Sequence, residues 1–165
     1  MIAIHNILVA TDFGEASDSA LCYGRELAGR FGATLHVLHV AENVYVTTFG
    51  AETYAAIVPE IQQEIEKAAR KRLDEALIDS DHSGPPAKAI VTTSSSPAYA
   101  IVDYAREHGI DLIIMGTHGR GALAHLVMGS VAERVVRLAS CPVLTVRNPE
   151  HEFVKPDTLL ATAHA

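Results

Sequence analysis

The stretch that decides the fold is Leu112-Ile113-Ile114-Met115-Gly116-Thr117-His118-Gly119-Arg120-Gly121, an apolar run followed directly by a loop rich in glycine. Farther along, Gly129-Ser130-Val131-Ala132 opens a pattern of apolar residues at helical spacing. An apolar run of strand length without alternation is typical of a strand that is covered on both faces. The stretch therefore predicts a buried strand, a glycine-rich loop and a helix, in that order.

Short apolar runs and helical patterns alternate along the rest of the chain. Gly32 and Gly109 are expected helix ends, and Ser96-Pro97 is an expected helix start. Crossovers of this length require parallel strands with right-handed connections. We therefore predict an α/β, Rossmann-like fold, an open five-stranded parallel sheet with helices on both faces, and we take its strand order as 3-2-1-4-5. The expected strands are 4–10, 34–40, 87–93, 111–115 and 143–147.

The helical patterns also predict which side chains face the core. In the long helix these are Ile57, Ile61, Ile65, Ala68, Ala69, Leu73, Ala76 and Leu77, and in the last helix Val131, Val135, Leu138 and Ala139. The link 41–56 falls outside the pattern, and we expect it to form a flap or an additional helix. Its aromatic residues Tyr45, Phe49 and Tyr54 are expected to form a packing patch.

Composition excludes several classes of protein. The chain has 165 residues, 48% of them apolar and 20% charged, as in one globular domain. The net charge of −7, from 13 basic and 20 acidic residues, argues against nucleic acid as a partner. No apolar run approaches the ~20 residues that span a bilayer, so we expect no membrane partner. Residues 1–6 carry no secretory signal, and we expect a cytoplasmic protein.

Cysteine and histidine do not indicate a metal site. Cys22 and Cys141 are the only cysteines and lack Cys-x-x-Cys spacing, so we expect two reduced, mostly buried thiols. Although the chain has nine histidines, His36 and His39 lie three apart in an expected strand and hence on opposite faces.

The glycine-rich loop has two interpretations. Its glycines serve either as ordinary turn residues or as places where a ligand approaches the backbone without meeting a Cβ. Gly129-Ser130 begins a helix, and free N–H groups with a partial positive charge of ~0.5 at such a terminus bind phosphate. A Walker loop is excluded because the Gly-Lys-Ser/Thr ending is missing, and the dinucleotide fingerprint is missing after the first strand.

The first expected strand ends in Ala10-Thr11-Asp12-Phe13-Gly14. Ligands of doubly wound sheets bind beyond the carboxyl ends of the strands, where the direction of the connections reverses. With the order 3-2-1-4-5, this loop and the loop after Gly116 face each other across one crevice. Asp12 is then either a turn or N-cap residue, or part of a nucleotide site with the ribose near Asp12 and the phosphates near Gly129.

The spacing Gly116-x2-Gly119-x9-Gly129-Ser130 resembles the nucleotide-binding signature of the universal stress protein family, and segments 7–13, 111–121, 129–135 and 141–147 are similar to that family too. The resemblance covers residues 1–147, which we take as one nucleotide-binding domain followed by a tail, 148–165. It implies a five-stranded parallel sheet and a homodimer whose seam is the last strand, Val143 to Val146. Because every glycine of the signature is present, the chain resembles the subclass that binds ATP.

The resemblance also implies which residues hold the nucleotide. Those at the base and ribose are Ala10, Thr11 and Asp12, with a backbone contact from Val40 to the adenine; those on the phosphate side are Met115, Gly116, Gly119, Gly129, Ser130 and Val131. Arg120 is either a cation for the phosphates or a solvated loop residue, and His118 and His125 flank the cradle. We expect ATP, or AMP or ADP, with any Mg²⁺ held through the phosphates.

These features predict an ATP-binding regulatory protein of the stress response. We expect no catalytic residue and at most slow ATP hydrolysis, because the sequence supplies neither a base for attacking water nor a phosphate-binding lysine. Two alternatives stay open. One is a slow nucleotide hydrolase or phosphotransferase using the same crevice, and the other is a nucleotide-free dimeric interaction protein.

Overall fold

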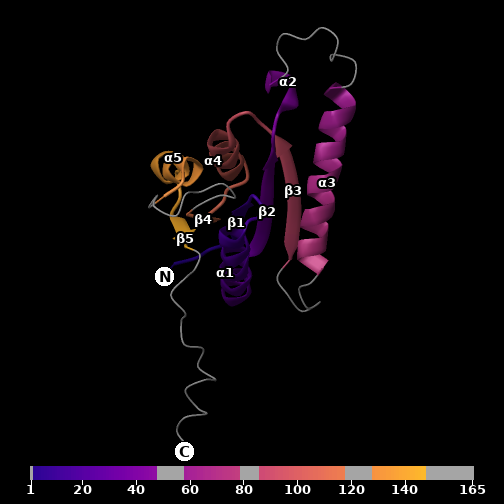
Figure 1. Ribbon diagram of the computed structural model, residues 1–165. Helices are drawn as coiled ribbons and strands as arrows, with labels where there is room; N and C mark the ends of the chain where they lie inside the picture. The colour runs from indigo at the N-terminus through magenta and orange to yellow at the C-terminus, as the bar shows by residue number, and fades with distance from the viewer. Residues whose placement is uncertain (1, 48–57, 79–85, 118–127, 148–165) are drawn as a thin grey trace, which may run out of the picture.

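The computed structural model describes residues 2–47, 58–78, 86–117 and 128–147, and all the predicted strands form (Figure 1). In chain order the elements are β1 Asn6–Thr11, α1 Glu15–Phe31, β2 Thr34–Ala41, α2 Val44–Thr47, α3 Val58–Ile78, β3 Ala87–Thr93, α4 Pro97–Glu107, β4 Leu112–Gly116, α5 Ser130–Leu138 and β5 Val143–Val146. The link after β2 thus contains a short helix, one of the two forms expected. Tyr45 of this helix is 50% exposed, whereas Phe49 and Tyr54 lie outside the described residues.

The strands form one parallel sheet in the order β3-β2-β1-β4-β5, which confirms the predicted fold. The chain runs outward from β1 through β2 to β3 and then crosses back to β4 and β5, so the direction of the connections reverses between β1 and β4. At that reversal Ala10 of β1 lies in register beside Met115 of β4. The loops that follow β1 and β4 therefore begin at neighbouring points of one sheet edge.

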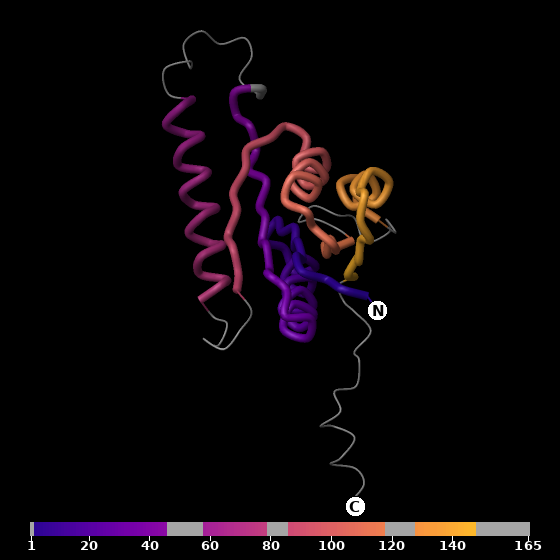
Figure 2. Tube along the Cα trace, turned by 180° about the vertical axis from the view of Figure 1, so that it is seen from behind, coloured from indigo at the N-terminus to yellow at the C-terminus, as the bar shows by residue number. Residues whose placement is uncertain are grey.

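Helices cover both faces of this sheet, as Figures 1 and 2 show. The core on one face includes residues of α1 and α3, and the core on the other includes residues of α4 and α5. Successive residues of β1 point to opposite faces, so Ile7 and Val9 join the first core and Leu8 joins the second. All three are fully buried, as expected for a strand covered on both sides.

The buried face of α3 differs from the predicted one. Ile61 and Ala68 are exposed, whereas Gln62 is only 5% exposed. The Gln62 amide keeps its hydrogen bonds on burial, because its Oε1 accepts from the N–H of Val44 and its Nε2 donates to the carbonyl of Glu42. The spacing of apolar residues cannot identify a polar side chain that is buried with its hydrogen bonds satisfied. The prediction that Ile61 and Ala68 face the core was therefore wrong.

Smaller corrections concern the end of α5 and one thiol. Leu138 closes α5 with 43% of its surface exposed, and the buried face of α5 is formed instead by Ala132 and Val135. Ser96 and Pro97 begin α4 as predicted, although the Ser96 side chain makes no capping hydrogen bond. Cys22 is exposed rather than buried, although it and the other cysteine are free thiols as predicted.

Two glycines allow α1 to approach the sheet closely. A Cβ on Gly24 would overlap Cγ2 of Val9 in β1. A Cβ on Gly116 would lie 2.8 Å from Cβ and 2.9 Å from the carbonyl carbon of Ala16 in α1. Both distances are below ordinary van der Waals contact, and the second involves backbone that cannot rotate away. Gly116 therefore has a packing role of its own, independent of any ligand.

We expect Gly116→Ala to lower the free energy of unfolding by about 1–3 kcal/mol, because it overpacks the contact between β4 and α1. Gly29→Ala is the matched control, because a Cβ at this exposed position of α1 would meet nothing within 4 Å. That change should raise the free energy of unfolding by about 0.5–1 kcal/mol. Urea denaturation measures both, and a neutral Gly116→Ala would contradict the close packing.

His36 is a buried ionisable group beneath α4. It is 2% exposed, its Nδ1 lies 2.9 Å from the hydroxyl of Tyr104, and its Nε2 has no partner in the described part of the chain. Burial lowers the pKa of His36 below its usual 6.5, and the positive charges of Lys88 and His108 lower it further. The folded state therefore holds His36 neutral.

Because the pKa of His36 is lower in the folded than in the unfolded chain, its contribution to stability is present above pH 6.5 and is lost as the pH falls toward the folded value. His36→Asn keeps a hydrogen-bond partner for Tyr104 but does not titrate. Between about pH 6.5 and pH 5, we expect this variant to reduce the slope of the free energy of unfolding against pH by up to ~1.4 kcal/mol per pH unit. Urea unfolding at several pH values measures this. An unchanged slope in His36→Asn would contradict this explanation.

Candidate functional site

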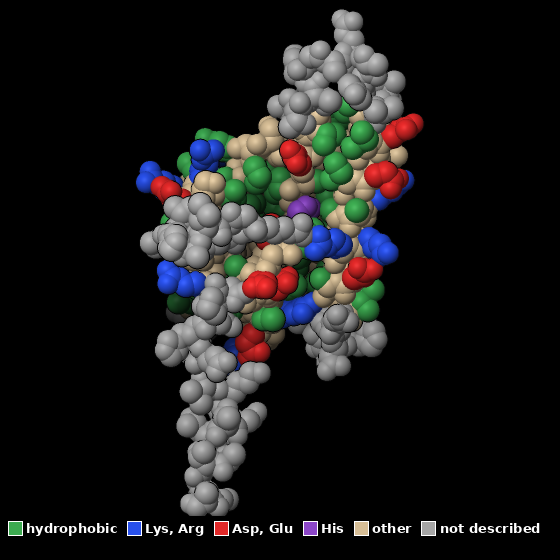
Figure 3. Space-filling view, viewed as in Figure 1, with side chains coloured by type: hydrophobic (Ala, Val, Ile, Leu, Met, Phe, Trp, Pro, Cys, Tyr) green, Lys and Arg blue, Asp and Glu red, His purple; other side chains and the backbone are tan. Residues whose placement is uncertain are grey.

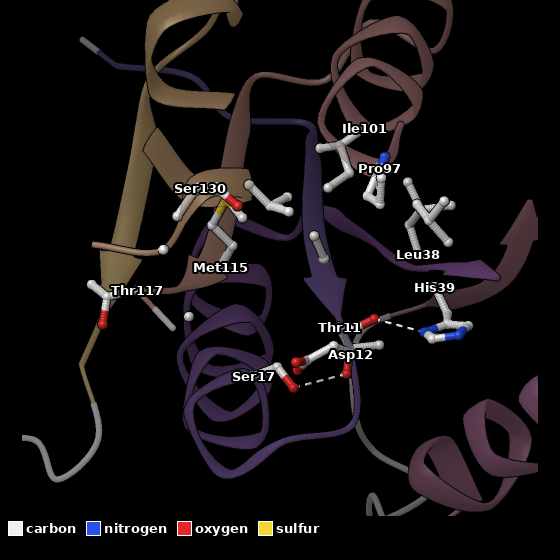
Figure 4. A pocket seen from close by; sticks show the side chains of 16 residues that line it. Thr11, Asp12, Ser17, Leu38, His39, Pro97, Ile101, Met115, Thr117 and Ser130 are labelled. Carbon is white, nitrogen blue, oxygen red and sulfur yellow. Dashed lines mark hydrogen bonds between the residues drawn. The ribbon is translucent and has the colours of Figure 1, made fainter. Parts of the chain in front are cut away.

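The reversal point of the sheet carries an open cleft of about 390 Å³. Its walls come from the ends of β1, β2 and β4 and from the first turns of α1, α4 and α5 (Figure 4). The lining residues are Ala10, Thr11, Asp12, Ser17, Leu38, His39, Val40, Pro97, Ile101, Met115, Gly116, Thr117, Gly129, Ser130, Val131 and Ala132. A volume of this size suits a small organic ligand.

The structure brings the sequence-predicted residues to this one cleft. Those that line it are Ala10, Thr11, Asp12, Val40, Met115, Gly116, Gly129, Ser130 and Val131. The expected crevice between the loop after β1 and the start of α5 is therefore present. Gly119 and Arg120 lie outside the described residues, as do His118 and His125.

Sequence reasoning missed part of the lining. The missed residues are Ser17, Leu38, His39, Pro97, Ile101, Thr117 and Ala132. A signal for some of them was available, because Leu38 lies two residues before Val40 and so shares its face of β2. Pro97 was recognised as a helix start, and the start of a helix that follows a parallel strand lies at the same sheet edge as the cleft. Ile101, one turn farther along α4, then follows.

One end of the cleft is apolar. Leu38 and Val40 come from β2, Ile101 from α4 and Met115 from β4, and all four belong to or pack against the core under α4 and α5. Figure 4 shows Leu38, Pro97 and Ile101 gathered beside one another, with Met115 on the β4 side. A flat apolar group such as an aromatic base gains free energy by leaving water for such a surface.

The loop after β1 is held by hydrogen bonds within itself. The Ser17 hydroxyl donates to the carbonyl of Gly14 at 2.8 Å, and the Thr11 hydroxyl lies 3.0 Å from Ser17 Oγ, to which it therefore donates. Thr11 Oγ1 in turn accepts from the N–H of Phe13 at 2.9 Å. Asp12 Oδ1 accepts from the N–H of Gly14 at 3.0 Å. These bonds fix the loop so that the Asp12 carboxylate stands at the cleft as a hydrogen-bond acceptor.

The opposite wall of the cleft is the N-terminus of α5. The N–H of Gly129 donates to the carbonyl of Thr117 at 2.6 Å, and the first bond of the helix runs from the N–H of Glu133 to the carbonyl of Gly129 at 2.9 Å. The intervening amides, of residues 130–132, lie in the first turn and have no partner within the helix, and the N-cap residue Gly129 has no side chain to accept from them. These amides and the helix dipole favour an anion at this wall.

The backbone of Gly129 has φ −73° and ψ 154°, a conformation that any residue adopts. Backbone freedom therefore does not require glycine there. The two signature glycines that the structure describes thus differ, because Gly116 is required by packing against α1 and Gly129 is not required by its own conformation.

The described residues offer no protein metal site. No group of three or more histidine, cysteine, aspartate or glutamate side chains is close enough to hold an ion within the part of the chain that is described. In the same residues no helix is long and apolar enough to cross a membrane. On the face drawn in Figure 3, acidic and basic side chains are interspersed rather than gathered into a basic stripe.

The fold and the cleft define a doubly wound α/β protein with an open cleft at its switch point. Residues 3–147 match the model of the universal stress protein family. Universal stress protein YxiE of Bacillus subtilis is 35% identical over 148 residues, which cover 87% of this chain and 99% of that protein. The chain therefore belongs to the universal stress protein family.

Solved structures agree with this assignment. Protein MJ0577 of Methanocaldococcus jannaschii superimposes with a TM-score of 0.78 at 26% identity, covering 89% of this chain and 98% of the other. The universal stress protein of Archaeoglobus fulgidus in complex with dAMP has a TM-score of 0.54 at 22% identity, covering 88% of this chain and 99% of the other. The second likeness shows a shared fold.

Proposed function

We propose that this protein is an ATP-binding regulatory module of the stress response and that the cleft between β1 and β4 holds the nucleotide. The observation that carries the proposal is the combination of three features in one cleft. The cleft is lined by an apolar end, a hydrogen-bond acceptor at Asp12 and a helix N-terminus at Ser130. Adenine, ribose and phosphates present the chemistry that matches these three features.

In this arrangement the adenine lies against Leu38 and Ile101, next to the backbone of Val40. The Asp12 carboxylate accepts hydrogen bonds from the ribose hydroxyls. The phosphate oxygens accept hydrogen bonds from the backbone amides at the start of α5 and from the Ser130 hydroxyl. The related fold of the Archaeoglobus fulgidus protein, which is in complex with dAMP, is compatible with an adenine nucleotide as ligand.

Regulation fits the cleft better than rapid catalysis does. Among the described lining residues, Asp12 supplies the one carboxylate and no lysine is present. A divalent cation would therefore find most of its ligands on the phosphates and in water, as Mg²⁺ prefers. A cleft that binds a nucleotide without a base to activate the attacking water supports slow hydrolysis of that nucleotide at most. The two free thiols are compatible with the reducing cytoplasm as the site of action.

We expect Gly129→Val to abolish ATP binding, because a branched side chain enters the space at the α5 terminus, and Ser130→Ala to weaken binding by about 1–3 kcal/mol through loss of a hydrogen bond to a charged phosphate. Calorimetric titration with ATP, AMP and GTP measures both. Mass spectrometry of small molecules released from the freshly purified protein identifies the resident ligand.

Ser140→Ala is the control for these variants, because it removes an exposed serine beyond the far end of α5. It should bind ATP as the unchanged protein does. Binding of ATP by Gly129→Val with unchanged affinity would refute the proposed phosphate site. Turnover of ATP faster than ~1 per second would replace the regulatory function with an enzymatic one.

We also propose a homodimer formed through β5. This strand lies at the edge of the sheet, beside β4 alone. The carbonyls of Pro142 and Val146 accept hydrogen bonds from β4, at Ile113 and Thr117, so alternate residues of β5 face the sheet. The backbone of Val143 and Thr145 therefore points outward, where it can pair with a second copy.

Thr145→Pro should convert the dimer into a folded monomer, because it removes an outward N–H while leaving the bonds to β4 in place. Light scattering coupled to gel filtration measures the mass, and circular dichroism checks the fold. Thr145→Val, which keeps the N–H, should remain dimeric. A Thr145→Pro variant that stays dimeric would place the interface elsewhere.

A further inference from the structure

Phe13 has a backbone conformation that is unusual for its side chain. With φ 61° it is the one residue other than glycine with positive φ in the part of the chain that the structure describes. Steric contact between the Cβ and the backbone makes this region unfavourable for a bulky residue. Such strain persists only where the surroundings hold it, and it concentrates at functional sites. Phe13 follows Asp12 directly, at the rim of the cleft.

The Phe13 ring is held by two other elements. Its centroid lies 4.4 Å from that of His39 in β2, with the rings inclined by 34°. The guanidinium carbon of Arg72 in α3 lies 4.2 Å from the same centroid, a cation–π distance. Neighbouring basic residues of α3 behave differently, because Arg70 and Lys71 pair with acidic residues one turn along their own helix. Arg72 has no ion pair with any described residue.

This stack is connected to the cleft through the backbone on either side of Phe13. Before it, the carbonyl of Thr11 lies 2.9 Å from Nδ1 of His39, the ring on which Phe13 packs. After it, the N–H of Gly14 donates to Oδ1 of Asp12. The left-handed turn at Phe13 is what returns the chain so that this N–H reaches the carboxylate. The ring contacts therefore help to set the direction of the Asp12 side chain.

We propose that Phe13 and Arg72 are positioning residues for the nucleotide site. The contact of Arg72 and His39 with the Phe13 ring holds a strained turn, and that turn aims the Asp12 carboxylate at the ribose hydroxyls of the ligand. Arg72 does so from α3 without lining the cleft itself. The inference rests on the proposed function, because it concerns how the same cleft recognises a ribose.

The test compares ATP with 2′,3′-dideoxy-ATP, which has no ribose hydroxyl for Asp12 to accept from. We expect Phe13→Ala to weaken ATP binding about tenfold or more, the scale of a hydrogen bond to a charged group. Arg72→Met should weaken it about two- to fivefold, the scale of an exposed cation–π contact. Binding of the dideoxy analogue should change little in either variant. Calorimetric titration measures the affinity of each variant and of the unchanged protein for both ligands.

Two controls separate positioning from general stability. Lys71→Met removes the adjacent exposed cation of α3 and should leave both affinities unchanged. In an Asp12→Asn background, Phe13→Ala should have no further effect on ATP binding, because the group that it positions has already lost its charge. Arg72 is exposed, so we expect Arg72→Met to fold, and this variant tests the positioning role even if Phe13→Ala fails to fold.

The outcomes also separate this inference from the proposed function. If Asp12→Asn loses ATP while Phe13→Ala and Arg72→Met bind it normally, the positioning role is wrong and the nucleotide site stands. If both ligands weaken equally in Phe13→Ala and Arg72→Met, the ring supports the fold rather than the direction of Asp12, and the inference is likewise wrong. If the unchanged protein binds no ATP, the proposed function fails and this inference fails with it.

Discussion

The architecture depends on the parallel pairing of β1 with β4 at the point where the connections reverse. Ala10 beside Met115 fixes the register, and the two loops that follow must then begin next to each other. The close approach of α1, allowed by glycine at positions 24 and 116, locks the same pair of strands from one face. At the opposite end of these strands the Asp111 carboxylate accepts from the N–H groups of residues 5 and 6, which lowers the pKa of Asp111. The cleft is a consequence of this pairing rather than a separate feature.

The cleft shows how one sheet edge collects unlike chemistry from distant parts of the sequence. Parallel strands all end at the same edge, and each following helix begins there, so strand ends supply side chains and helix starts supply free amides. Here β2 and α4 contribute the apolar wall, the loop after β1 contributes a carboxylate, and α5 contributes an uncapped terminus. A ligand with an apolar end and an anionic end fits that polarity, which is the physical basis for proposing an adenine nucleotide as the ligand of this member of the universal stress protein family.

Strain and burial at two further positions show which contacts the pattern of the sequence cannot reveal. Phe13 looks like an ordinary apolar residue in the sequence, yet its backbone is left-handed and its ring joins β2 to α3. Gln62 looks like a solvent-facing residue of an amphipathic helix, yet it is buried and hydrogen bonded to the segment after β2. In both cases the deciding partners lie many residues away. Local spacing predicts which face of an element is apolar, but not which polar or strained residue a distant partner will satisfy.

The sequence by itself determined the alternation of strands and helices and the parallel sheet, because the spacing of apolar residues, the helix ends and the crossover lengths are local properties with few topological solutions. Asp12 and Ser130 could be assigned to one rim once the strand order was taken as 3-2-1-4-5, whereas Val40 was assigned there from the resemblance to the universal stress protein family. Only the tertiary structure decided that Gly116 is a packing glycine, that His36 is buried with no partner for Nε2 among the described residues, and that Arg72 reaches the loop beside Asp12. Those properties depend on which side chains meet across separate elements, and a contact between elements is fixed by packing in three dimensions rather than by spacing along the chain.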